Sequence, residues 1–134
     1  LEMLALKLGF RDEEFTAAAL ETEPLLPMNS TCAVFAESEV VGLLARGVPK
    51  GEIAAAAHNS IASRVASMAR RVGQKGAYCF VGGGARNAAL VKAIGEHLNR
   101  VLHVPPEAQV ITALGAALGA RRKLERQARK EAEA

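Results

Sequence analysis

The segment that most constrains the fold is AYCFVGGGARN at residues 77–87, where a short apolar run ends in three glycines. A continuous apolar run of this length is typical of a strand buried in a parallel sheet, and glycines directly after it permit a tight turn into a helix. Residues 86–98 have a helical pattern, and VLHV at 101–104 predicts a second short strand. Strand, helix and strand in this order predict a βαβ unit, so we expect an α/β fold.

Helical patterns dominate the rest of the chain. The predicted helices cover residues 1–8, 11–20, 32–45, 50–72 and a last segment from about 107 into the C-terminal tail. Asp12 is suitably placed to cap the second of these helices. Two short strands are too few for a stable open sheet, and we therefore expect sheet partners outside this chain.

The start of the chain also indicates that part of the protein lies outside this sequence. It reads LEMLALKLGF, without Met and already in helical rhythm, which we interpret as a piece of a longer protein. We expect a single lobe with three parts. These are a helical lead-in and loop over 1–31, a core over 32–120 and a charged helical tail over 121–134.

Composition narrows the class of protein. The net charge of +3 depends on the tail, which holds six of the seventeen Lys and Arg residues, so we expect no nucleic-acid partner. No apolar run approaches the roughly 20 residues that a membrane span needs, and we expect no membrane contact. Two cysteines far apart in the sequence exclude a disulfide scaffold and indicate a reducing compartment. We expect the protein in the cytoplasm.

The glycine turn is the strongest local signal for a ligand. Without a GK[ST] sequence it is no Walker loop, and GGGARN lacks the third, spaced glycine of a dinucleotide fingerprint. What remains is a nucleotide contact in which backbone N–H groups approach the ligand with no Cβ in the way. The alternative is that the glycines serve only the tight turn. Arg86, just after them, suits either a phosphate or ribose contact or a solvated helix start.

The two cysteines and the histidines are the other candidates. Cys32 follows three small polar residues and starts a predicted helix, where N–H groups and the helix dipole favour a thiolate. Cys79 lies inside the predicted strand, and we expect a buried apolar thiol. His58 is expected to be a surface or capping residue. It and the other two histidines, His97 and His103, have no second ligand at zinc-site spacing.

Four segments in order resemble a known family. They read NSTCAVFAESEVVGLLARG, HNSIASRVASMARR, FVGGGARNAAL and VPPEAQVITALGAALGA. Together they resemble the C-terminal half of the 2-hydroxyglutaryl-CoA dehydratase activators, which form one family with the ATP-binding subunits of benzoyl-CoA reductase. The resemblance runs from residue 1 to about 120. It implies the C-terminal lobe of a ribonuclease H-like ATPase of the actin, sugar-kinase and chaperone superfamily.

The resemblance also implies cofactors and partners. Such proteins bind ATP or ADP with Mg²⁺ and are dimers, with a second copy or a paralogous subunit, that share one [4Fe-4S] cluster. ATP hydrolysis drives an electron from the cluster to a dehydratase or reductase that acts on an acyl-CoA. A donor protein such as ferredoxin or flavodoxin supplies the electron that reduces the cluster.

Site residues follow from the resemblance by position. Cys32 matches a cluster ligand. Gly82, Gly83, Gly84 and Asn87 match the glycine turn on the adenosine side of the nucleotide, which usually reads GGVAxN, so position 84 departs from the family.

The closing segment and the absent motifs complete that assignment. Gln109 and residues 113–117 match a closing helix that packs near the interdomain hinge. The first cluster cysteine, the phosphate loops and the acidic Mg²⁺ residues have no match here. We therefore expect no catalytic residue in this chain, and neither ATP hydrolysis nor a complete cluster from it alone.

Two alternatives remain open at this point. One is the nucleotide-binding lobe of a sugar or acyl kinase-like protein of the same superfamily, without a cluster. The other is an α-helical interaction module that binds no nucleotide.

Overall fold

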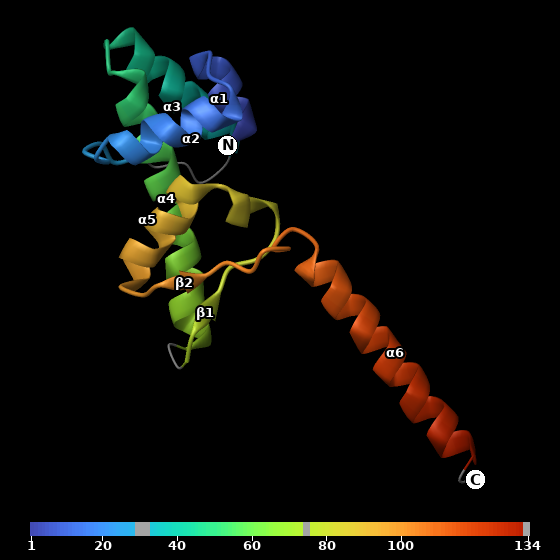
Figure 1. The fold of residues 1–134 in the computed structure, drawn as a ribbon. Helices are drawn as coiled ribbons and strands as arrows, with labels where there is room; N and C mark the ends of the chain where they lie inside the picture. Colours follow the sequence, from blue (N-terminus) through green and yellow to red (C-terminus); the bar gives the residue numbers. More distant parts are fainter. Residues whose placement is uncertain (29–32, 74–75, 133–134) are drawn as a thin grey trace.

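The chain is helix-rich, with a single small sheet in the part that the computed structural model describes, residues 1–28, 33–73 and 76–132 (Figure 1). The helices are α1 (Glu2–Leu8), α2 (Asp12–Glu21), α3 (Ala33–Ala45), α4 (Lys50–Val72), α5 (Ala88–Leu98) and α6 (Ile111–Ala132). The strands are β1 (Tyr78–Cys79) and β2 (Leu102–His103), and a short 3-10 helix, η1 (Gly83–Arg86), follows β1. The predicted α/β class with few strands is confirmed.

The start of α2 differs from the prediction in its cap. Asp12 is the first residue of α2 and caps nothing; Arg11 precedes the helix. The Glu14 carboxylate instead reaches back and accepts the Arg11 backbone N–H at 2.8 Å, the return half of a capping box. The hydrogen bond from the Arg11 backbone N–H is the main cause that holds the pKa of Glu14 below its usual value, and hydrogen bonds from the Arg11 side chain add to this effect.

Helix α4 is the central packing element of the described chain. It packs against α2 over its first half and against α5 over its second. Figure 1 shows α4 running from the group of α1, α2 and α3 to the group of α5, β1 and β2. The run Ala54–Ala57 is at most 4% exposed, because small side chains let α2 approach closely. On the α2 side, Phe15 is 1% exposed, a burial that stabilises the fold by about 1.5–3 kcal/mol. Two apolar clusters therefore share one helix.

The sheet is parallel, as predicted, and is covered on one face only. Tyr78 pairs with Leu102, and Cys79 pairs with His103. Tyr78 and Leu102 pack against the apolar cluster of α4 and α5, whereas Cys79 and His103 are exposed. The expectation of a buried Cys79 thiol was therefore wrong. Alternate residues of a strand face opposite sides, and no described element covers the second side.

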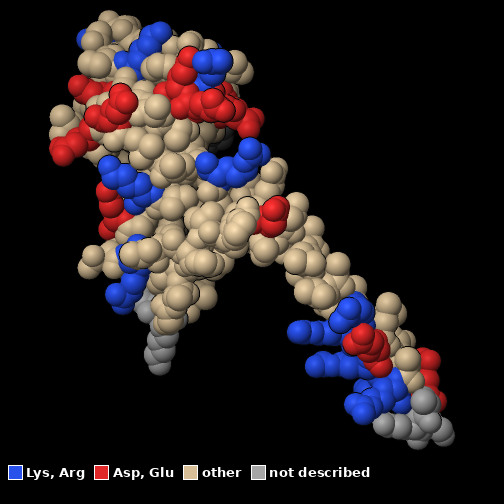
Figure 2. All heavy atoms as spheres, viewed as in Figure 1, with Lys and Arg blue, Asp and Glu red and all other residues tan. Residues whose placement is uncertain are grey.

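Helix α6 extends away from the other described elements (Figure 1). It begins at Ile111, after a turn over residues 106–110, and not at the predicted residue 107. A Cβ added at Gly115 or Gly119 would meet no heavy atom within 4 Å outside its own helix, so no described element packs against α6 at these two glycines. The packing of residues 113–117 near an interdomain hinge stays a prediction. Figure 2 shows Lys and Arg gathered over the far end of α6. None of the helices in the described ranges combines the length and apolar character that a membrane crossing requires.

Candidate functional site

The glycine turn lies where the two parallel strands end. η1 follows β1, and the segment of residues 104–110 follows β2. The Gly82 N–H donates to the Ala108 carbonyl at 2.7 Å, and the Phe80 N–H donates to the His103 carbonyl at 2.9 Å, so the two segments are tied together. In open α/β sheets, ligands bind in the crevice beyond the carboxyl ends of the strands. The turn therefore occupies the position that such a sheet uses for a ligand.

The three glycines of the turn differ in whether the local structure requires a glycine at that position. Gly82 has φ +93° and ψ −178°, a region that is essentially restricted to glycine. A Cβ at Gly84 would lie 3.4 Å from the Phe80 ring and 3.5 Å from Leu90, an ordinary contact. Gly83 is exposed, and a Cβ there would meet nothing within 4 Å. Turn geometry thus requires glycine at position 82 but not at position 83, whose bare backbone is open to a ligand.

Replacing Gly82 with alanine tests the structural part of this distinction. We expect the free energy of unfolding to fall by about 1–3 kcal/mol, because alanine must adopt a strained φ and ψ. Gly83→Ala is the matched control and should stay within about 0.5 kcal/mol of the wild type. Urea unfolding followed by circular dichroism measures both. Equal losses in the two variants would contradict the assignment.

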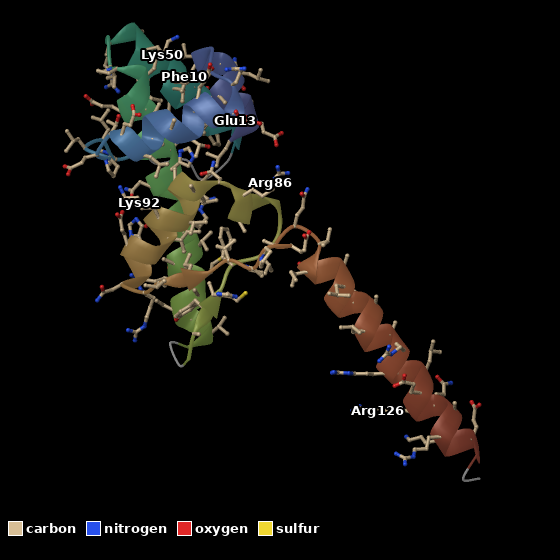
Figure 3. The ribbon with its side chains drawn as sticks, in the orientation of Figure 1. Phe10, Glu13, Lys50, Arg86, Lys92 and Arg126 are labelled. Atoms are coloured by element: carbon tan, nitrogen blue, oxygen red, sulfur yellow. The ribbon has the colours of Figure 1, made fainter. Side chains whose placement is uncertain are left out.

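An open pocket of about 500 Å³ adjoins the turn. Its lining comes from η1 and from the segment after β2: Ala85, Arg86, Val104, Pro105, Pro106, Glu107, Ala108 and Gln109. Arg86 lies on η1 (Figure 3), and its guanidinium donates to the Gln109 side-chain oxygen at 3.3 Å across the two segments. The Arg86 side chain is therefore at the pocket and not at a merely solvated helix start.

Asn87 connects the turn to the core. Its side-chain oxygen accepts the Leu90 N–H at 2.8 Å and so caps α5. Its side-chain nitrogen donates to Thr16 Oγ1 at 3.1 Å and lies 3.0 Å from His58 Nε2. One amide thus joins the end of the turn to both α2 and α4.

His58 is buried, at 2% exposure, and the expectation of a surface or capping residue was wrong. Its Nδ1 lies 2.8 Å from the Ala54 carbonyl, and its ring lies against Phe15 with centroids 5.0 Å apart. The sequence carried one signal of this burial, since His58 directly follows the four alanines that contact α2. Burial away from water is the main cause that lowers the pKa of His58 below its usual 6.5.

A pH dependence of stability follows from His58. The folded protein holds this ring neutral, whereas the unfolded chain takes up a proton near pH 6.5. The unfolded state therefore binds more protons as the pH falls, and the stabilisation present above pH 6.5 is lost on the way down to the lower folded pKa. We expect a slope of up to about 1.4 kcal/mol per pH unit. Urea unfolding at several pH values checks this, and His58→Gln should lose that component; an identical profile would contradict it.

The structure brings no metal site together in the residues that it describes. Cys32, the predicted cluster ligand, lies outside the described residues. Within the described ranges, no group of three or more His, Cys, Asp or Glu side chains is able to hold a metal ion. His97 is occupied by a hydrogen bond, with Nε2 at 2.7 Å from the Asn59 side-chain oxygen.

The sequence matches one protein family over most of its length. The pattern of the BadF/BadG/BcrA/BcrD ATPase family covers residues 1–120. A 2-hydroxyisocaproyl-CoA dehydratase activator of Clostridioides difficile is 36% identical over 118 residues, which are 88% of this chain and 44% of that protein. The (R)-2-hydroxyglutaryl-CoA dehydratase activating ATPase of Acidaminococcus fermentans is 37% identical over 123 residues, 92% of this chain and 47% of that protein.

A solved structure shares the fold. The activator of the 2-hydroxyisocaproyl-CoA dehydratase from Clostridium difficile, with bound ADPNP, superposes with a TM-score of 0.80 at 32% identity. The match covers 96% of this chain and 48% of that one. The chain therefore spans about half the length of the proteins that it resembles.

Proposed function

Because the chain belongs to the BadF/BadG/BcrA/BcrD ATPase family, we propose that it is one lobe of an ATP-hydrolysing electron-transfer activator. The whole protein would use ATP hydrolysis to pass a low-potential electron from a [4Fe-4S] cluster to a 2-hydroxyacyl-CoA dehydratase or a benzoyl-CoA reductase. The chain would form a single C-terminal lobe, with a lead-in over 1–31, a core over 32–120 and a charged tail over 121–134.

The glycine turn carries the nucleotide part of this proposal. Its place at the carboxyl ends of two parallel strands, the bare backbone of Gly83 and the adjoining pocket fit the adenosine side of ATP or ADP. The similar activator was solved with ADPNP bound, which supports a nucleotide as the ligand. Gly83 and Gly84 would offer backbone to the ligand, and Gly82 would set the turn. Mg²⁺ would be held outside this chain.

Asn87 would act by supporting the turn. Both sides of its amide are engaged inside the protein, by Leu90 on one side and by Thr16 and His58 on the other. A group so occupied has little left to offer a ligand. We therefore assign Asn87 to holding the end of the turn in place, with the nucleotide contact made by the glycines.

Cys32 carries the cluster part, which depends on the family resemblance alone. It would be one ligand of a [4Fe-4S] cluster shared with a second copy or a paralogous subunit. The cluster would supply one-electron chemistry at low potential. A donor such as ferredoxin or flavodoxin would reduce it, and the dehydratase or reductase would accept the electron.

The cluster proposal has a direct test in the full-length protein, purified without oxygen. We expect about four irons and four sulfides per dimer, an EPR signal after reduction, and the loss of all three in Cys32→Ala. Cys79→Ala is the matched control, and it should keep the iron because this cysteine lies on β1. An iron-free protein that still binds ADP would contradict the cluster and favour the kinase-like alternative.

A further inference from the structure

The buried histidine of α4 has a defined hydrogen-bonding polarity. The Ala54 carbonyl can only accept, so the His58 Nδ1 at 2.8 Å must carry the proton. In the neutral ring, Nε2 is then an acceptor. The atom of Asn87 that lies 3.0 Å from Nε2 must therefore be the amide nitrogen.

Thr16 imposes the same orientation independently. Its hydroxyl donates its one hydrogen to the Asp12 carbonyl at 2.9 Å, so Oγ1 is left to accept from the Asn87 amide at 3.1 Å. The two N–H groups of Asn87 thus meet two acceptors. A flipped amide would place its oxygen against both acceptors and its nitrogen against the Leu90 N–H.

We propose that His58 is a positioning residue for the nucleotide turn. By presenting an unprotonated Nε2 to Asn87, it fixes the amide so that its oxygen caps α5 and holds the end of the Gly82–Gly84 turn. The backbone N–H of Asn87 donates to the Gly84 carbonyl at 3.1 Å, so a shift of Asn87 would move the turn itself. His58 is 2% exposed and does not line the pocket, so it acts through Asn87.

The inference rests on the proposed nucleotide function, and ADP is the probe in the full-length protein. His58→Leu removes the acceptor and keeps an apolar side chain in the core. We expect the Kd for ADP to rise about tenfold, within the usual range of coupling between sites. Ile53→Ala, on the same helix and 0% exposed, is the control for lost stability and should leave Kd within about twofold. Calorimetric titration measures Kd, and urea unfolding measures stability.

Further variants keep the test decisive. If His58→Leu does not fold, the half-buried Thr16 takes its place, and Thr16→Val should weaken ADP binding in the same direction. Asn87→Asp keeps a good cap but has no N–H to donate, and it should weaken ADP binding as well. Equal values of Kd in the network variants and in Ile53→Ala would overturn the inference.

Failure of the proposed function is distinguishable from failure of the inference. If the wild type does not bind ADP, the nucleotide proposal is wrong. The positioning role is then decided by hydrogen exchange at the Leu90 N–H, which the Asn87 oxygen protects. Faster exchange in His58→Leu than in Ile53→Ala would support the role, and equal exchange would overturn it.

Discussion

Replacing Asn87 with alanine is expected to lower the free energy of unfolding by about 1.5–5 kcal/mol. Loss of the α5 cap costs about 0.5–2 kcal/mol. The change also leaves the His58 Nε2 without its donor in a buried position, which costs about 1–3 kcal/mol. Urea unfolding of the wild type and the variant measures the sum.

The Asn87 result has a matched control. Asn99 ends α5 in the left-handed conformation, with φ 51°, and glycine accepts that conformation without strain. Asn99→Gly should therefore change the free energy of unfolding by less than about 0.5 kcal/mol. An Asn87→Ala variant that lost less than about 1 kcal/mol would mean that the amide network contributes little.

Replacing Gly83 with valine is expected to weaken ADP binding with little effect on folding. The added side chain would enter space that is open in the protein but that the proposed nucleotide fills. Overpacking a fitted contact costs about 1–3 kcal/mol, which raises Kd about 5–150-fold. Calorimetric titration of the full-length protein with ADP measures this change.

The control for Gly83 is the same substitution elsewhere. Gly42 lies in α3, and a Cβ there also meets nothing within 4 Å. Gly42→Val should therefore leave the affinity for ADP unchanged. Equal loss of affinity in the two variants would point to a general effect of valine on the fold.

Local patterns predicted the elements that local physics decides. The predicted helix over 50–72 coincides with α4, and Pro49 and Gly73 flank its two ends. The tight turn after the first strand was also predicted, since three consecutive glycines have few other uses. Parallel pairing followed from the intervening helix.

Burial was harder to predict, because it depends on which elements pack together. The sequence predicts a surface or capping role for His58, yet α2 covers this residue. The preceding alanines suit close packing but do not identify α2 as the helix that packs there. Cys79 was assigned to the core, yet only one face of the sheet is covered in the described chain. Packing partners also decide the surroundings of residues 113–117. Their small side chains suit close packing, but the described chain supplies no partner at Gly115.

The candidate site was also predictable from the sequence only in part. The glycine turn was found from sequence, but the separate reasons for Gly82 and Gly83 needed backbone angles and the space around each residue. Asn87 was placed on the nucleotide side by resemblance. Its hydrogen bonds to α2 and α5 join residues up to 71 positions apart, a separation that no local pattern encodes.

The most direct test of the account is to map where a nucleotide touches this chain. The full-length protein would be photolabelled with an azido-adenine analogue of ADP, with and without excess ADP, and digested with trypsin. We predict that the label recovered from this chain lies in the peptides of residues 76–86 and 101–121, which hold the turn and the segment after β2, and that ADP suppresses it. Label confined to peptides of α1 to α4, or unaffected by ADP, would contradict a nucleotide site at the glycine turn.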